Sequence, residues 1–313
     1  MGFELKPFLL KIPLVNLIVK LLSAVKPKFL EGLSLFDLLE LYITGIAKGA
    51  LGARAGAIAY SFFMALFPFL LFIIVVIPYI PIDGFRADFL FFLESFLPPT
   101  TSDFFDEAIF KNLEENNSNA GLISSVLVLS IFLMANGVNA LFSGFEKSYH
   151  EQLKRNFIRQ YLYALSVALI LAFILILTVI VLGYFNIYVL SNLESYGVIK
   201  AREIDFWTTI ATYLFFVITI YFATAVLYYF GTKEGKVTKF FSFGALLTTV
   251  LTMLISFLFG IYIENFSKYN ELYGSIGALL ILLIYLWLNA NILLLGFELN
   301  MSINLIKKRK NLQ

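Results

Sequence analysis

The chain of 313 residues contains no cysteine and only one histidine, His150. Disulfide bonds, thiolate metal sites and multi-histidine metal sites are therefore excluded. Charged residues make up 14% of the chain, against about 25% in a typical soluble domain. Hydrophobic residues reach 60%, with a mean hydropathy of +0.87, which predicts an integral membrane protein. The formal net charge of +2 is too small to indicate nucleic acid or another polyanionic partner.

Sequence motifs that carry catalysis are also absent. We find no Walker A loop, no Gly-x-Ser-x-Gly, no His-Glu-x-x-His and no GxGxxG motif that opens a helix. The most varied polar segment, residues 146–161, contains acids and bases at the i, i+4 spacing of ordinary helical pairs. We therefore expect no catalytic residue, no metal and no cofactor, and we expect that the protein is not an enzyme.

Six apolar segments are long enough to cross a bilayer, which takes about 20 residues in a helix. None contains Lys or Arg, and Glu298 is the one acid within them. The sequence therefore predicts an all-α protein, a polytopic bundle of six transmembrane helices over Ala57–Ile80, Gly121–Phe142, Tyr161–Val189, Phe206–Phe230, Phe240–Ile263 and Ile276–Leu299.

The distribution of basic residues predicts the orientation. Of 23 Lys and Arg residues, 18 fall in the segments on one side of the predicted membrane and five on the other. Because basic residues are retained in the cytoplasm, we expect both termini inside the cell, in a bacterial inner membrane.

The segments outside the spans indicate three regions. Residues 1–56 form a basic N-terminal segment, in which residues 7–28 have the spacing of an amphipathic helix; a poorly ordered basic tail is the alternative. Residues 57–299 form the transmembrane domain, whose outer loop, 81–120, has the pattern of two amphipathic helices. Residues 300–313 form a basic tail.

Polar residues within or beside the spans concentrate towards the predicted cytoplasmic side. They come from the first, second and last spans, and we expect them to form one patch: Arg54, Ser61, Asn136, Asn139, Trp287, Asn291 and Glu298. Such a patch can be a substrate path, since ionisable groups in membranes usually face water or a partner. It can equally be packing, with Arg54 and Glu298 paired at the boundary. Small residues four apart, such as Ala53 and Ala57, favour close helix packing.

Three stretches resemble the YihY/BrkB family of bacterial inner-membrane proteins. They are GAIAYSFFMALFPFLLFII (56–74), GVNALFSGFEKSYHEQLKRNFIRQY (137–161) and YGSIGALLILLIYLWLNANILLLGFELN (273–300). The resemblance implies six transmembrane helices and assigns no chemical role to any residue. The positions that match the family, besides Trp287 and Glu298, are Tyr60, Pro68, Tyr273, Gly274, Gly277 and Gly296.

We therefore expect a transporter or a lipid flippase-like protein of the cell envelope. Arg54 would attract an anionic head group, and the basic inner rim would gather anionic membrane lipids. The alternative is a non-catalytic membrane scaffold that recruits envelope-assembly proteins through the Phe-rich outer loop. A homo-oligomer is compatible with either function.

Overall fold

The computed structural model describes residues 13–27, 32, 34–37, 39–40, 50–76, 120–146, 157–196, 203–231, 239–265 and 275–310. Within these residues the regular structure is helical throughout, so the all-α prediction is confirmed. The helices are α2 (Pro13–Ala24), α4 (Ala50–Val76), α8 (Ala120–Glu146), α9 (Phe157–Tyr184), the π-helical segment η4 (Phe185–Leu190), α10 (Ser191–Ser195), α11 (Ile204–Gly231), α12 (Phe243–Asn265) and α14 (Ser275–Lys310).

Five helices in the described part of the chain are long and apolar enough to cross a membrane. These stretches are Val128–Glu146, Ile158–Leu190, Phe206–Gly231, Phe243–Ile263 and Leu279–Asn304. Each falls on one of the predicted spans. The remaining prediction, the first span, coincides with α4, where the apolar stretch among described residues is the shorter Leu51–Leu66. Five candidate spans are therefore present, and the count of six stays a prediction.

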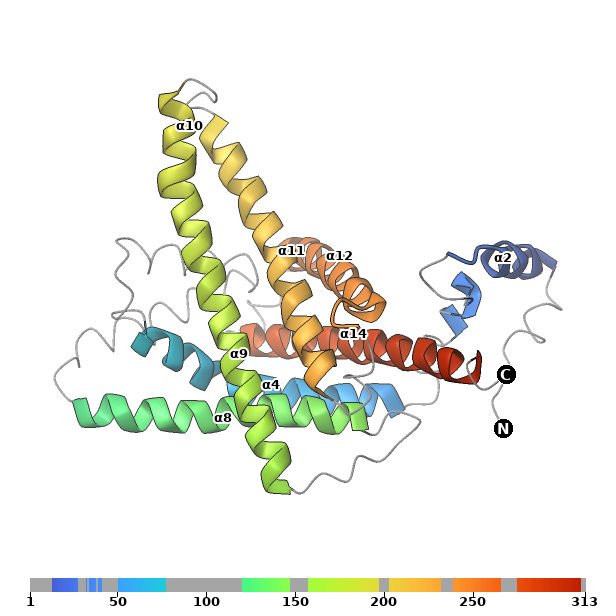
Figure 1. Cartoon of the computed structure of the whole chain (residues 1–313), viewed down its shortest axis with the longest axis horizontal. Helices are drawn as coiled ribbons and strands as arrows, with labels where there is room; N and C mark the ends of the chain where they lie inside the picture. Colours follow the sequence, from blue (N-terminus) through green and yellow to red (C-terminus); the bar gives the residue numbers. More distant parts are fainter. Residues whose placement is uncertain are drawn as a thin grey trace.

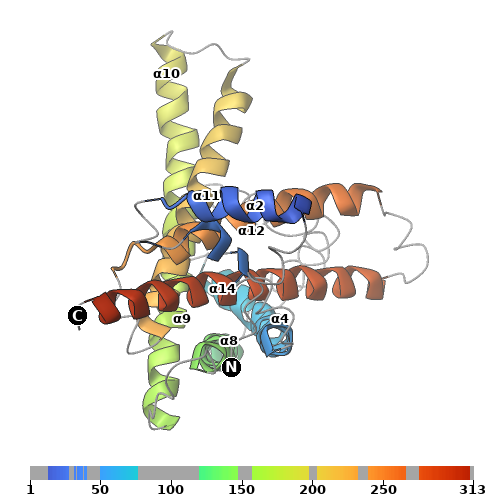
Figure 2. The ribbon, with the colours of Figure 1, turned by 90° about the vertical axis from the view of Figure 1, so that its right-hand side faces the viewer.

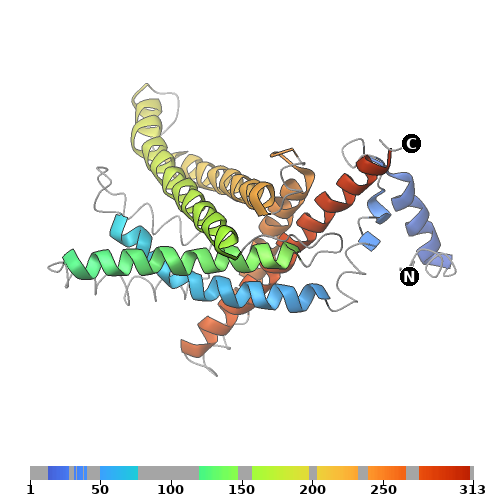
Figure 3. The same cartoon turned by 60° about the horizontal axis from the view of Figure 1, so that its bottom comes forward.

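The long helices cross one another instead of running parallel. Helices α4 and α8 lie side by side, and Figure 2 shows both nearly end-on. Helices α9 and α11 form a long antiparallel pair that crosses α8 steeply (Figure 1). Helix α14 crosses α4 and α8 obliquely, as Figure 3 shows, and α12 packs on α14. The chain thus places the start of α4 against the second half of α14.

Helices α4 and α8 pack closely through small residues at two levels. A Cβ on Gly137 would lie 2.9 Å from the Cβ of Ala65, and one on Gly144 would lie 2.7 Å from Cδ1 of Ile58. The two contacts are two helical turns apart on both helices, as an antiparallel pair requires. The sequence predicted that Ala53 and Ala57 of α4 lie in a close helix contact. This prediction was wrong, because both residues are exposed.

The interface of α12 with α14 combines a still closer approach with hydrogen bonds. A Cβ on Gly244 would collide with the carbonyl oxygen of Gly296 and with the side chain of Asn300. Asn300 Oδ1 accepts a hydrogen bond from the Gly244 backbone N–H (2.8 Å), and its Nδ2 donates to Ser242 Oγ (2.9 Å). Ser242 Oγ also accepts from the Ala245 N–H, so the side chains of Asn300 and Ser242 bond two backbone N–H groups in the first turn of α12.

Further along the same interface, hydroxyl groups bridge the helices. The buried Tyr228 of α11 donates to the carbonyl oxygen of Leu293 (2.6 Å) and lies 2.6 Å from Thr248 Oγ1. Ser256 Oγ lies 2.7 Å from the hydroxyl oxygen of Tyr285. These contacts hold three helices together where lipid offers polar groups no hydrogen-bond partners.

One helix boundary differs clearly from the one expected. The last helix does not end at Leu299: α14 runs to Lys310, and Met301, Ile303 and Asn304 in this extension are buried. An apolar face therefore continues into the segment predicted as a tail. The predicted helices of the outer loop lie outside the described residues.

We predict that Gly296→Ala and Gly244→Ala each destabilise the protein by about 1–3 kcal/mol or more, because the added methyl group must force α12 and α14 apart. Thermal unfolding in detergent measures this effect. Gly260→Ala, on α12, is the matched control, since a Cβ there meets nothing within 4 Å. Equal unfolding temperatures for all three variants would contradict the close approach.

Candidate functional site

An ion pair joins α4 to α14 at their crossing. Arg54 Nη2 lies 3.0 Å from Glu298 Oε1, and the two side chains are only 12% and 15% exposed. Arg54 Nη1 also donates to the backbone carbonyl of Gly144 in α8 (3.2 Å). The Arg54 guanidinium group therefore links its own helix to two others. This ion pair is the one expected if Arg54 and Glu298 serve in helix packing.

A cleft of about 440 Å³ lies beside this crossing, between α4, α12 and α14. Its walls are mainly aliphatic, and its lining residues are Gly52, Leu251, Leu254, Ile255, Trp287, Leu288, Asn291, Ile292 and Leu295. Leu254 and Trp287 are 49% and 41% exposed, so the cleft opens at the protein surface. Glu298 follows Leu295 by one helical turn, which places the ion pair just beyond one end of the cleft.

Trp287 and Asn291 supply the polar groups of the cleft. Trp287 Nε1 donates to the carbonyl oxygen of Gly52 (3.3 Å), which makes a second contact between α14 and α4. Asn291 Nδ2 donates to the carbonyl oxygen of Trp287 one turn earlier (2.7 Å). This bond satisfies one amide proton and leaves Asn291 Oδ1 without a hydrogen bond to any described residue. The cleft therefore has carbon walls with a few polar groups, as small-molecule sites commonly have.

The asparagines of α8 do not join this site. Asn136 is exposed, and Asn139 Oδ1 accepts a hydrogen bond from Gln160 Nε2 of α9 (3.1 Å). The carbonyl oxygen of Ser61 lies against α8 at Gly137, away from the ion pair. The expectation that polar side chains of three spans converge is thus wrong for α8, which contributes a backbone carbonyl instead.

The positions that match the family are scattered. Tyr60 is 59% exposed, whereas Pro68 lies buried inside the continuous helix α4. Gly277 is buried near the start of α14, and Gly296 makes the close contact with α12. Tyr273 and Gly274 lie outside the described residues.

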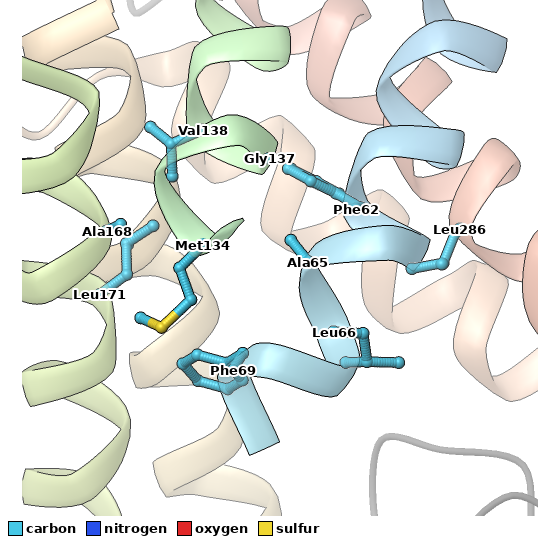
Figure 4. Close-up of a pocket in the computed structure, with 10 residues that line it drawn as sticks. All are labelled: Phe62, Ala65, Leu66, Phe69, Met134, Gly137, Val138, Ala168, Leu171 and Leu286. Atoms are coloured by element: carbon cyan, nitrogen blue, oxygen red, sulfur yellow. The ribbon is translucent and has the colours of Figure 1, made fainter. Parts of the chain in front are cut away.

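A second pocket, of about 240 Å³, lies between α4, α8 and α9, with Leu286 of α14 also in its lining. Figure 4 shows its side chains, almost all of them apolar: Phe62, Ala65, Leu66, Phe69, Met134, Gly137, Val138, Ala168, Leu171 and Leu286. The pocket supplies no group that could orient a polar ligand.

The sequence indicated Gly52 for close helix packing and did not place it in the cleft, because that position depends on the crossing of α4 with α14. Sequence reasoning missed Tyr228, Thr248 and Asn300, since hydroxyl and amide groups in apolar helices carry no pattern that identifies their partners. Among the described residues, no three His, Cys, Asp or Glu side chains lie close enough together to hold a metal ion.

The comparisons with known proteins agree with a polytopic membrane protein. Residues 43–313 match the family described as virulence factor BrkB. The putative ribonuclease-like protein YfkH of Bacillus subtilis (strain 168) is 26% identical over 83% of this chain and 91% of its own length. A UPF0761 membrane protein of Coxiella burnetii (strain Dugway 5J108-111) is 26% identical over 78% of this chain and 84% of its own length.

A UPF0761 membrane protein of Alteromonas mediterranea is 24% identical over 85% of this chain and 87% of its own length. No solved structure matches the chain. The chain is therefore a multi-pass membrane protein.

We predict that Arg54→Met and Glu298→Leu each destabilise the protein by about 3 kcal/mol, because each leaves the partner charge buried without its counter-ion. The double variant should recover most of this loss, since it removes both charges. A double-mutant cycle of thermal unfolding in detergent measures the coupling. If the losses simply add, the two side chains do not stabilise each other.

Proposed function

The chain belongs to the virulence factor BrkB family of membrane proteins, and we propose that it binds a membrane lipid in the cleft between α4, α12 and α14 and moves it between leaflets. The observation that carries this proposal is the cleft itself. It lies on two candidate spans, Phe243–Ile263 and Leu279–Asn304, so its opening faces the bilayer.

The chemistry of the cleft favours an amphiphile over an ion or a small polar solute. Leu251, Leu254, Ile292 and similar side chains offer a chain-binding wall, whereas Asn291 Oδ1 and the Trp287 ring offer contacts to a polar head. The volume of about 440 Å³ falls in the range of small-molecule sites. We infer that part of one lipid, its glycerol region and the first segment of a chain, occupies the cleft.

The ion pair between Arg54 and Glu298 alters which lipid head group we expect the site to bind. Arg54 is neutralised by Glu298, so it does not by itself favour an anionic head group. A zwitterionic head fits better, because its two charges can compete with the two partners of the pair at once. Opening of the pair would then be coupled to lipid binding, and both residues would act as a latch between α4 and α14.

We further propose the bacterial inner membrane as the location, with both termini in the cytoplasm and without enzymatic activity. The 18 to 5 distribution of basic residues supports the orientation. The name ribonuclease-like belongs to the Bacillus relative. The rival function, a scaffold for envelope proteins, depends on the outer loop, which lies outside the described residues.

Gly52 offers a direct test, because it lines the cleft and a Cβ at its position meets nothing within 4 Å. We predict that Gly52→Leu fills the cleft without unfolding the protein. Gly56→Leu is the matched control, since Gly56 lies one turn later on α4, is equally free of contacts and does not line the cleft.

Tryptophan fluorescence provides the binding measurement, because the chain contains only Trp207 and Trp287. In the Trp207→Phe background, phosphatidylcholine with a brominated acyl chain, added to protein in detergent, should quench Trp287 in a saturable way. Gly52→Leu should weaken this binding at least tenfold, whereas Gly56→Leu should leave it unchanged.

Proteoliposomes containing a fluorescent phosphatidylcholine then test movement. The unmodified protein should accelerate dithionite access to inner-leaflet lipid, and Gly52→Leu should abolish the acceleration. Saturable binding without translocation would retain the lipid site and overturn the flippase function. Identical quenching in Gly52→Leu and Gly56→Leu would mean that the lipid does not bind in the cleft.

A further inference from the structure

The N-terminal helix α2 (Pro13–Ala24) presents its apolar side outwards. Leu17, Ile18 and Leu21 are 64%, 55% and 61% exposed. Val25, which follows the helix, continues the i, i+4, i+8 stripe of Leu17 and Leu21 and is 48% exposed. A helix on a water-soluble surface has the opposite arrangement, with this stripe turned towards the core.

The inward side of α2 holds Val19, which is 3% exposed, together with two uncharged polar residues. Asn16 Oδ1 and Ser23 Oγ are buried and make no hydrogen bond within the part of the chain that the structure describes. Lys20 is exposed beside the apolar stripe, and Lys26 is exposed just after the helix. The outer face of α2 is therefore an apolar stripe flanked by two positive charges.

A short anchor ties α2 to the ends of two candidate spans. The Leu35 backbone N–H donates to the carbonyl oxygen of Val25 (3.1 Å). The Leu35 side chain packs against the cluster formed by Leu299, Ile303, Phe243 and Leu247. Phe243 begins one candidate span, and Leu299 and Ile303 lie in the last turns of another. The anchor thus lies beside the ends of both candidate spans.

Hydrogen bonds make this anchor rigid. The Ser34 backbone N–H donates to Asp37 Oδ2 (2.7 Å), and the Asp37 N–H donates to Ser34 Oγ (3.2 Å). This reciprocal arrangement is a capping box with aspartate in the acidic position. Ser34 and Phe36 are each 1% exposed, so the anchor is also packed from several sides.

We propose that the outer face of α2 binds the surface of an anionic lipid bilayer, with Leu17, Ile18 and Leu21 at the level of the acyl chains and Lys20 and Lys26 among the phosphates. Two observations select this partner. The lysines complement anionic lipid, and the anchor places the face beside the ends of two candidate spans. The proposal does not depend on the cleft or its function.

The absence of cysteine from this chain allows labelling at single introduced cysteines. Nitroxide labels at Leu21→Cys, on the apolar stripe, and at Lys20→Cys, beside it, form a matched pair. In vesicles with 30% phosphatidylglycerol, the Leu21 label should be more accessible to oxygen than to a water-soluble nickel complex. The Lys20 label should show the reverse preference.

The contribution of charge is tested by Lys20→Glu/Lys26→Glu with the label at Leu21. Each lysine near an anionic surface favours binding about fivefold, and the reversed charges add repulsion. We therefore expect the ratio of bound to detached α2 to fall by roughly 30-fold or more. Pure phosphatidylcholine vesicles should reduce the binding of the unmodified helix in the same direction.

Three outcomes would overturn the proposal. A Leu21 label that the nickel complex reaches freely in anionic vesicles would mean that the face lies in water. Dipolar broadening between labels would mean that it contacts a second copy of the chain. Accessibility that is independent of lipid charge and unchanged in the glutamate variant would mean that the lysines do not select the partner. Unchanged thermal unfolding of each variant controls for misfolding.

Discussion

The ion pair between Arg54 and Glu298 is the contact on which the crossing of α4 with α14 depends. Both side chains are nearly buried, where the attraction between charges is much stronger than in water. The second bond of Arg54, to the Gly144 carbonyl, extends the contact to α8. The hydrogen bond from Trp287 to the Gly52 carbonyl is a second contact, so α14 bonds α4 at two points along its length. The cleft lies between these points, so its shape follows from the same contacts.

The interface of α12 with α14 is stabilised differently. Because the hydrophobic effect does not drive apolar helices together within lipid, their association depends on close packing and hydrogen bonds. Gly244 and Gly296 allow the backbones to approach, which increases dispersion contacts. Asn300 then bonds the Gly244 N–H and Ser242, while Tyr228 bonds Thr248 and the Leu293 carbonyl. On α12, the exposed Val250 and Phe257 provide an apolar surface for the surrounding lipid.

Two apolar surfaces in the described part of the chain, the cleft and the outer face of α2, have polar groups at one edge. The cleft has Asn291 and the indole of Trp287, whereas α2 has Lys20 and Lys26. A polar edge beside an apolar surface matches the division of a lipid into head and chain. The cleft is suited to a single lipid, and α2 to a bilayer surface, because one is enclosed by three helices and the other is a single exposed face.

The sequence by itself determined the positions of the long helices and most of the polar face of α14. Continuous apolar segments placed five candidate spans, because composition alone decides which segments are stable in lipid. The i, i+4, i+11 spacing of Trp287, Asn291 and Glu298 put them on one side of α14, as helical geometry requires. The extension of α14 to Lys310 was missed, since the charged end conceals the buried Ile303 and Asn304.

Only the tertiary structure decided which helix each polar residue meets. Periodicity placed Asn136 and Asn139 close together on α8, yet it could not orient that helix. The contacts of Gly137 with Ala65 and of Gly144 with Ile58 set its rotation, which leaves Asn136 exposed and turns Asn139 towards Gln160. A helical sequence defines a face, whereas the neighbour of that face depends on close packing between segments far apart in the chain.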